Sequence, residues 1–251
     1  MKPGAAPAGH RQRLDVLLVE LGLAPSRERA RARILAGDVV VDDHRVDKPG
    51  TAVPRAAHIR LKGQDLRWVS RGGLKLDHAL SQFGVVVAGR VAVDVGASTG
   101  GFTDVLLQRG AVLVHAVDVG WGQLAEALRR DPRVRNLERT HVKDLGPLEP
   151  VPGFACVDVS FISLRRVLPD VLRVLARPAD IVALVKPQFE AGRGAVGSGG
   201  IVREPAERER ALREVREAAV ALGLVERGVV ESPVTGQKGN VEFLVHWEVP
   251  A

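Results

Sequence analysis

Asp94-Val95-Gly96-Ala97-Ser98-Thr99-Gly100-Gly101-Phe102-Thr103-Asp104 is the stretch that decides the fold of this 251-residue chain. It follows an apolar run, residues 91–93, that is typical of a buried strand, and it continues into residues 105–107, which favour a helix. A glycine-rich turn between a strand and a helix lets the backbone approach a nucleotide cofactor closely. The next apolar run ends at Asp118, 22 residues after Gly96, where a carboxylate commonly holds ribose hydroxyls. The pattern therefore predicts an α/β domain with a nucleotide-cofactor cradle.

The details of this cradle favour S-adenosylmethionine over a dinucleotide. The spacing is G-x-x-x-G-G rather than the G-x-G-x-x-G of pyrophosphate binders, and the turn has no Walker lysine. Asp94 precedes the first glycine, which suits a cationic ligand and would repel a pyrophosphate. A dinucleotide site and a glycine turn without any ligand are the alternatives. The residues that we expect to contact the cofactor are Asp94, Gly96, Ser98, Thr99, Gly100, Phe102, Asp118 and Asp144. For Asp144, a role in capping a turn is an equally good interpretation.

The charge of the chain is concentrated near its beginning. The formal net charge is +6; residues 1–62 carry 12 lysines and arginines against 7 acidic residues, whereas residues 63–251 carry 24 against 23. This asymmetry predicts a polyanionic partner for the N-terminal part. No segment has the length and apolar character of a membrane span, and the first ten residues do not resemble a signal peptide. The single cysteine, Cys156, excludes an internal disulfide and a zinc cluster, so we expect a core cysteine, no metal and a cytoplasmic location.

Residues 12–62 are predicted to form a small α+β domain after a disordered tail, residues 1–11. Apolar spacing indicates helices over 13–23 and 27–36, the second capped by Ser26 and closed by Gly37. Short strands are expected at 39–41 and 59–61. The second helix predicts a basic patch directed at RNA phosphates, with a solvated helix as the alternative; its members are Arg27, Arg29, Arg31 and Arg33.

After a linker at residues 63–69, residues 70–251 alternate between strands and helices. The predicted strands are 91–95, 112–118, 134–138, 154–159, 181–186, 224–230 and 241–249, the last two forming an antiparallel hairpin at one side of the sheet. The predicted helices are 74–83, 102–109, 123–130, 164–175 and 205–222. Residues 189–200 are dense in glycine and are interpreted as a mobile lid.

Four charged residues are expected at one edge of this sheet, where open α/β sheets bind their ligands. Asp158 and Lys186 end predicted strands, Glu242 begins the last one, and Lys75 opens the helix that precedes the first strand. Each alone is equally well interpreted as a solvated strand end, but two lysines and two carboxylates together can satisfy one another as a partly buried cluster.

In order and context, these four residues resemble the K-D-K-E tetrad of the FtsJ-like ribose 2′-O-methyltransferases. Residues 70–73, 94–102, 158–163 and 186–190 are similar to segments of the TlyA family of ribosomal RNA methyltransferases, and residues 13–15, 26–27 and 37–39 are similar to an S4 RNA-binding domain. The resemblance implies a Rossmann-like methyltransferase domain with a mostly parallel sheet, joined to an S4-like domain. It also implies methyl transfer from S-adenosylmethionine to a cytidine 2′-hydroxyl in 16S or 23S ribosomal RNA, or in both.

The tetrad suggests a chemical division of roles. We hypothesise that Lys186 contacts the 2′-hydroxyl and accepts or relays its proton, and that Lys75 orients the ribose. The alternative is that Asp158 and Glu242 hold Lys186 in place and the hydroxyl proton leaves late; Arg71 is expected to bind a phosphate nearby. We expect a monomer that acts on ribosomal subunits and has no membrane partner. The alternatives are a non-catalytic ribosome-assembly factor and a membrane-acting haemolysin, the label that this family has also carried.

Overall fold

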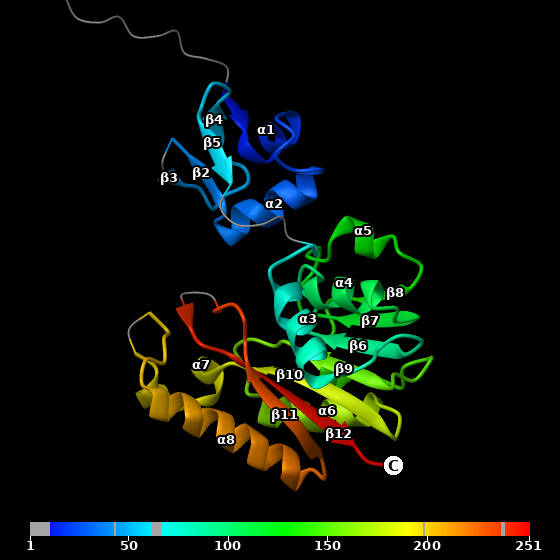
Figure 1. Cartoon of the computed structure of the whole chain (residues 1–251). Helices are drawn as coiled ribbons and strands as arrows, with labels where there is room; N and C mark the ends of the chain where they lie inside the picture. Colours follow the sequence, from blue (N-terminus) through cyan, green and yellow to red (C-terminus); the bar gives the residue numbers. More distant parts are fainter. Residues whose placement is uncertain (1–10, 43, 62–66, 198, 237–238) are drawn as a thin grey trace, which may run out of the picture. The chain divides into compact units, whose positions relative to one another are not determined.

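The computed structural model divides the chain into two compact units, Met1–Arg71 and Gly72–Ala251 (Figure 1). The residues that it describes are 11–42, 44–61, 67–197, 199–236 and 239–251. The predicted tail and the predicted linker fall mostly outside the described residues, although Arg11 already belongs to a strand. The proposed domain limits at residues 12, 62 and 70 therefore stay predictions.

Two helices, α1 (Leu14–Glu20) and α2 (Arg27–Ala36), form the centre of the N-terminal unit. Ser26 caps α2, because its Oγ accepts a hydrogen bond from the backbone N–H of Arg29 at 3.2 Å. Gly37 ends the helix with a left-handed φ of +74°, as the sequence predicts. The first helix ends just before Gly22, which turns left-handed (φ +68°) where the sequence predicts the helix C-terminus.

Short strands complete this unit. Three of them, β3 (His44–Arg45), β2 (Val39–Val41) and β5 (Ile59–Leu61), form one antiparallel sheet. A second sheet pairs β1 (Arg11–Arg13) with β4 (Ala52–Pro54). Apolar residues of both helices pack against the strands in one small core, which includes Leu14, Leu17, Leu18, Ile34 and Val39.

The C-terminal unit is built on a seven-stranded sheet in the order β11-β12-β10-β9-β6-β7-β8. Its strands in chain order are β6 (Val91–Val95), β7 (Leu113–Val117), β8 (Val134–Leu137), β9 (Phe154–Val157), β10 (Ala179–Val185), β11 (Val225–Glu231) and β12 (Phe243–Val249). The five strands from β6 to β10 pair in parallel, whereas β12 runs antiparallel to both β10 and β11. This confirms a Rossmann-like, mostly parallel sheet with a C-terminal antiparallel hairpin.

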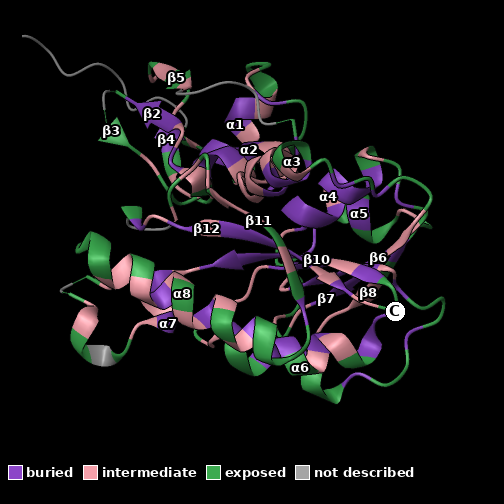
Figure 2. Cartoon of the chain, turned by 60° about the horizontal axis from the view of Figure 1, so that its bottom comes forward, coloured by how far each residue is buried: buried purple, intermediate pink, exposed green. Residues whose placement is uncertain are grey.

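Helices cover both faces of the sheet (Figure 1). They are α3 (Gly72–Phe83), α4 (Gly101–Gln108), α5 (Glu126–Arg129), α6 (Leu164–Val174), α7 (Pro187–Glu190) and α8 (Pro205–Ala221). One core joins α6 and α8 to the sheet through residues such as Leu168, Val215 and Ile181. Figure 2 shows the consequence, with buried central strands and helices whose outer sides are exposed.

Two expected elements differ from the structure. The helix predicted over 123–130 shrinks to α5, because the backbone is not helical at its N-cap Ala125 (ψ 136°); Gln123 and Leu124 precede it and donate their backbone N–H groups to Glu138 Oε1 (3.1 and 3.4 Å). The segment predicted as a lid begins with a packed element, since Glu190 belongs to α7 and is 5% exposed.

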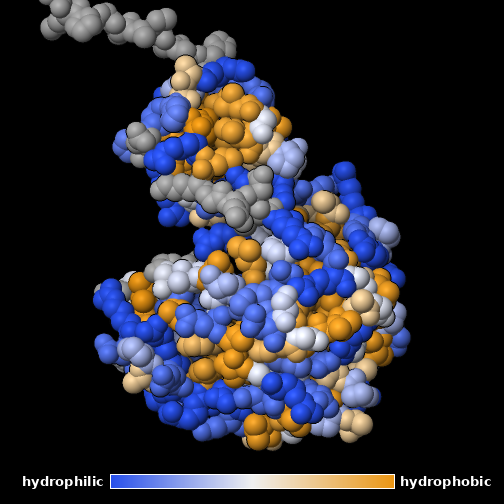
Figure 3. All heavy atoms as spheres, in the orientation of Figure 1, coloured by the Kyte–Doolittle hydropathy of each residue, from blue (hydrophilic) through white to orange (hydrophobic). Residues whose placement is uncertain are grey.

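The surface of the C-terminal unit carries both polar and apolar side chains, which intermix on the face seen in Figure 3. Such mixing is usual on globular domains. Cys156 lies inside, fully buried in β9, as predicted for a core residue. Within the described part of the chain, every helix is too short or too polar to cross a bilayer.

Candidate active site

The four charged residues expected at one edge of the sheet do lie there. Asp158 and Lys186 directly follow β9 and β10, and Lys75 lies in the first turn of α3. Glu242 immediately precedes β12, whose first residue, Phe243, pairs with the last residue of β10. Because β12 runs antiparallel to β10, its beginning meets the carboxyl ends of the parallel strands.

Lys186 is held by two residues of the loop that follows β9. Its Nζ lies 2.5 Å from Asp158 Oδ1 and donates a hydrogen bond to Ser160 Oγ at 2.9 Å. The two charged side chains are only 11% and 22% exposed, so their mutual contact replaces much of the water that each would otherwise bind. The sequence analysis did not identify Ser160, because a serine in a loop gives no local signal.

Lys75 and Glu242 form a second, more deeply buried ion pair. Lys75 Nζ lies 2.5 Å from Glu242 Oε2, and the glutamate side chain is 2% exposed. Gln188 donates from Nε2 to the other carboxylate oxygen of Glu242 at 3.3 Å. Gln188 lies two residues after Lys186, so α7 connects the two ion pairs. The four residues thus make two pairs rather than one mixed cluster.

An exposed aromatic side chain accompanies these charges. Phe161 is 91% exposed and has a left-handed φ of +64°. Its ring centroid lies 5.0 Å from that of Phe189, and Lys186 Nζ lies 5.9 Å from the Phe189 ring. An apolar side chain in this backbone conformation is uncommon and points to a local constraint. Phe161 gives no signal in the sequence, because its exposure and its backbone conformation are visible only in the structure.

The loop between β6 and α4 has the shape of a ligand cradle. Gly96 and Gly100 have left-handed φ values of +89° and +94°, and Ser98, between them, has φ +48°. A Cβ at Gly96 would stand 2.2 Å from the backbone oxygen of Asp158, so only glycine fits there. The cradle therefore touches the loop that carries the partner of Lys186.

Asp118 joins this loop to the next strand end. Its Oδ2 accepts a hydrogen bond from Ser98 N at 2.8 Å, and its Oδ1 accepts one from Gly120 N at 2.6 Å. The carboxylate is thereby fixed beside the glycine turn. Its remaining lone pairs are available to hydroxyl groups.

Asp94 lies beneath the loop rather than on its open side. It is fully buried, and its Oδ2 accepts a hydrogen bond from Thr103 Oγ1 at 2.6 Å, which ties β6 to α4. Its Oδ1 has no hydrogen-bond partner among the described residues. Burial raises the pKa of this carboxyl to about 7. A direct contact of Asp94 with a ligand stays a prediction.

The other expected cofactor residues differ in their surroundings. Thr99 lies in the loop and accepts a backbone hydrogen bond from Ala125 at 3.2 Å, whereas Phe102 is buried (3% exposed). Asp144 is exposed and ends a short 3-10 turn after β8. Among the residues described, no three His, Cys, Asp or Glu side chains gather in a way that could hold a metal ion.

In the N-terminal unit, a buried carboxylate organises part of the basic patch. Asp15 is fully buried and accepts hydrogen bonds from Arg13 Nε and Nη2 (3.0 and 2.9 Å) and from Arg27 Nη2 (3.1 Å). Hydrogen bonding to the guanidinium of Arg13, and to a smaller extent to that of Arg27, lowers the pKa of the Asp15 carboxyl. The side chains of Arg13 and Arg27 are 54% and 60% exposed, so both are fixed and still accessible. The sequence analysis had not included Arg13 in the patch.

The remaining predicted RNA-binding arginines are not equivalent. Arg31 is exposed on α2, and Arg29 donates a hydrogen bond to the backbone oxygen of Trp68. Arg33 is 6% exposed, so the prediction that all four helical arginines share one exposed patch is wrong. Position 33 lies on the α2 face that also buries Ala30 and Ile34, which places it inside. Arg71 directly precedes α3.

Comparison with protein families matches two parts of the chain. Residues 68–249 match the FtsJ-like methyltransferase family, and residues 12–59 match the S4 domain. Together these ranges include the four charged residues of the sheet edge, the glycine loop and the arginines of α2.

Individual relatives extend over nearly the whole chain. It is 49% identical to the "16S/23S rRNA (cytidine-2'-O)-methyltransferase TlyA" of Mycobacterium tuberculosis, over 94% of this chain and 89% of that protein. It is 39% identical to "Hemolysin A" of Brachyspira hyodysenteriae, over 94% of this chain and 99% of that protein. A solved structure of a hemolysin-named protein from Streptococcus thermophilus shares the fold with a TM-score of 0.76 and 47% identity, over 97% of this chain and 90% of that chain.

Gly96→Ala tests the close approach of the cradle to Asp158. We expect it to reduce the free energy of unfolding by about 3–5 kcal/mol and to weaken S-adenosylmethionine binding, because the methyl group adds a steric clash to an unfavourable φ. Gly89→Ala is the matched control: its φ is +76°, but nothing lies within 4 Å of its Cβ position. It should cost only about 1–2 kcal/mol and leave binding unchanged. Denaturant unfolding and calorimetry measure both quantities, and equal losses in the two variants would contradict the steric argument.

Asp94 predicts a pH dependence of stability. Its pKa is raised from 3.8 to about 7 in the folded protein, so the folded state holds a proton that the unfolded state releases. The free energy of unfolding should therefore fall as the pH rises from about 4 to 7, by up to about 4 kcal/mol from this group. Asp94→Asn cannot ionise and should flatten the profile. Chemical denaturation across this pH range measures the free energy of unfolding of both proteins. The difference between the two profiles reports Asp94, because the contributions of the other titrating groups cancel. Parallel profiles would contradict the raised pKa of Asp94.

Proposed function

The chain belongs to the FtsJ-like methyltransferase family and carries an S4 domain, and from this premise we propose that it methylates a cytidine 2′-hydroxyl in ribosomal RNA. As a member of that family it is a methyltransferase that takes its methyl group from S-adenosylmethionine. The substrate is inferred from the relatives, of which one is named for 16S and 23S rRNA cytidine methylation. The observation that carries the proposal is Lys186, held by Asp158 and Ser160 at the edge that also holds the glycine loop.

The residues of the glycine loop fit S-adenosylmethionine. Gly96 leaves room where any side chain would fill the space against Asp158, and the fixed carboxylate of Asp118 suits ribose hydroxyls. We assign the contacts with the cofactor to the loop 96–100 and to Asp118. Asp94 lies beneath this loop as a buried carboxyl group, which provides a negative charge when ionised and a dipole when protonated. When bound, S-adenosylmethionine supplies an electrophilic methyl group on a positively charged sulfur. Its leaving group is a neutral thioether, so the reaction does not require a metal ion.

Lys186 provides the contact with the ribose hydroxyl. An ammonium group has three N–H donors, and within the described structure two of them are directed at Asp158 and Ser160. The third N–H is available to bind the 2′-oxygen before the reaction. Transfer of one proton from Lys186 to Asp158 then frees a lone pair on Nζ, and once this lone pair turns to the 2′-hydroxyl it accepts the hydroxyl proton as the oxygen attacks the methyl group. The charge of the lysine is thus unchanged, and the proton ends on the carboxylate.

The second ion pair positions the ribose. Lys75 is 12% exposed and Glu242 is 2% exposed, so their charges are kept in place by each other and by Gln188. A fixed ammonium beside the reacting sugar can orient its oxygens, and such positioning is a major source of rate enhancement. The exposed ring of Phe161 offers an apolar face for the nucleobase on the same side of the sheet.

The N-terminal unit supplies affinity for RNA in this proposal. Arg13, Arg27 and Arg31 present positive charge, and Asp15 fixes the first two. Such contacts with phosphates strengthen binding without reading the sequence. We further propose that the chain acts as a monomer in the cytoplasm, where ribosomal RNA is available.

Lys186→Ala tests the catalytic assignment. We expect transfer of methyl groups to ribosomal subunits to fall by at least about a thousandfold, because the ribose loses its proton acceptor and its anchor. S-adenosylmethionine binding, measured by calorimetry, should stay near that of the unchanged protein. Lys143→Ala, at an exposed lysine, is the control and should retain full activity. An active Lys186→Ala protein would refute the assignment, and mapping of 2′-O-methyl marks on ribosomal RNA would identify the nucleotide.

Arg27→Glu combined with Arg31→Glu tests the RNA-binding surface. Reversal of two exposed charges should weaken binding to ribosomal RNA by roughly tenfold or more at moderate salt and reduce its salt dependence. The matched control reverses Arg177 and Arg213, two exposed arginines of the C-terminal unit, with the same change in net charge. Filter binding at several salt concentrations measures both proteins. Equal losses would mean that net charge, rather than this surface, determines affinity.

A further inference from the structure

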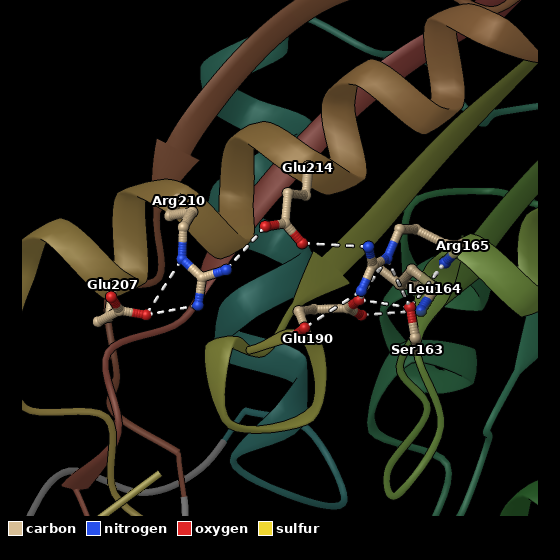
Figure 4. Close-up of polar contacts among 7 residues, drawn as sticks. All are labelled: Ser163, Leu164, Arg165, Glu190, Glu207, Arg210 and Glu214. Carbon is tan, nitrogen blue, oxygen red and sulfur yellow. Dashed lines mark hydrogen bonds and ion pairs between the residues drawn. The ribbon is translucent and has the colours of Figure 1, made fainter. Parts of the chain in front are cut away.

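Glu190 is a buried carboxylate that none of the proposed chemical steps uses. It ends α7, four residues after Lys186, and is 5% exposed. Its Oε2 accepts a hydrogen bond from Ser163 Oγ at 2.5 Å, and its Oε1 accepts one from the backbone N–H of Leu164 at 2.7 Å (Figure 4). Both carboxylate oxygens are therefore occupied by the beginning of α6.

The residues that Glu190 holds belong to the same loop as the partners of Lys186. Asp158 and Ser160 lie in the connection from β9 to α6, and Ser163 is the N-cap at the end of that connection. The loop is thus attached to the segment after β10 at two points: by Lys186 near its start and by Glu190 at its end. A carboxylate at a helix N-terminus is also favoured by the free N–H groups there.

Arg165 extends the attachment to α8. It donates from Nη2 to the backbone oxygen of Glu190 at 3.2 Å and from Nη1 to Glu214 Oε2 at 3.1 Å. Arg210 in turn contacts Glu214 at 3.0 Å and Glu207 at 2.6 Å (Figure 4). These outer residues are about one-third exposed, so their ion pairs contribute little to stability. The buried contacts of Glu190 are the ones that can hold the loop.

We propose that Glu190 is a positioning residue for methyl transfer, which fixes the loop 158–163 so that Asp158 and Ser160 hold Lys186 in its reactive orientation. The proposal rests on the proposed function, because it concerns the same acceptor group. Glu190 acts through the loop and touches neither substrate. A displacement of about 1 Å at a reacting group can reduce a rate by roughly a hundredfold, so a loop held at one end only is expected to be costly.

A stability role alone makes a different prediction from a positioning role. If Glu190 only stabilised the fold, its loss would lower the fraction of folded protein but not the turnover of the folded fraction. If it positions the loop, its loss lowers kcat for protein that still binds S-adenosylmethionine normally. Glu190 makes no hydrogen bond to the cofactor loop, which Asp118 holds through Ser98 N, so S-adenosylmethionine binding provides a count of the folded sites.

Glu190→Ala and Glu190→Gln provide the test. We expect Glu190→Ala to lower kcat by about 10- to 100-fold per cofactor-binding site, with KM values for RNA and S-adenosylmethionine within about twofold of the unchanged protein. Glu190→Gln keeps the shape of the side chain. Its amide oxygen can accept the hydrogen bond from Leu164 N, and its amide nitrogen can bond to Ser163 Oγ. This variant should therefore keep most of kcat. Glu207→Gln, which alters only the exposed end of the network, is the matched control and should be fully active.

Ser163→Ala sharpens the result. It removes one of the two groups that Glu190 holds and also the cap that Ser163 Oγ provides to Arg165 N. Its effect on kcat should add only in part to that of Glu190→Ala, because both changes break the connection between Glu190 and Ser163. If folded Glu190→Ala protein turns over at the unchanged rate, or if the two effects add fully, the positioning role is wrong. If the unchanged protein itself transfers no methyl group to ribosomal RNA, it is the proposed function that fails.

Discussion

Among the described glycines, Gly96 makes the closest approach to another part of the backbone, at Asp158. A Cβ at Gly96 would stand 2.2 Å from the Asp158 oxygen, so the two loops meet without any side chain between them. Gly96 opens the proposed cofactor loop, and Asp158 holds the lysine assigned to the acceptor. The contact follows directly from the strand order, since β6 and β9 are parallel neighbours whose ends lie side by side. In the proposed function, this one glycine therefore sets how closely the methyl donor and the acceptor can approach each other.

The charged residues around this contact have two roles that cannot be separated by a loss of activity alone. Lys75 with Glu242, and Lys186 with Asp158, are largely buried, and each charge depends on its partner. Removal of one member leaves an uncompensated charge in a poorly hydrated place, which is strongly unfavourable. A variant of this cluster can therefore become inactive through rearrangement as well as through loss of chemistry. S-adenosylmethionine binding helps to distinguish the two, because Asp118 holds the glycine loop through a hydrogen bond from Ser98 N that involves none of the four charged residues.

Local sequence patterns were sufficient to predict the features that are determined by residues close together in the sequence. The bounds of β6, the Ser26 cap and the Gly37 end of α2 all follow the prediction. Two of the errors involve bonding between residues distant in the sequence. Glu138 accepts hydrogen bonds from the segment that precedes α5, and Glu190 turns the start of a glycine-dense segment into a packed anchor. Neither contact produces a periodic signal, so neither could be inferred from spacing. The placement of the tetrad followed from motif resemblance and strand order, but its division into two ion pairs required the structure.

The distribution of contacts also indicates where selectivity arises. Arg13 and Arg27 are fixed by a buried carboxylate and are suited to phosphates, which every RNA carries. Binding through them increases the time that RNA spends on the protein but does not choose a nucleotide. In the proposed function, the requirement for a 2′-hydroxyl restricts the reaction to RNA, because DNA offers no acceptor to Lys186. The proposal then places discrimination among ribose hydroxyls where a base and its sugar are held together, at the edge formed by Lys75, Lys186 and Phe161. If Glu190 positions the loop 158–163 as proposed, selectivity also depends on how rigidly that loop is held, since a loop that moves would no longer fix Lys186 in one orientation.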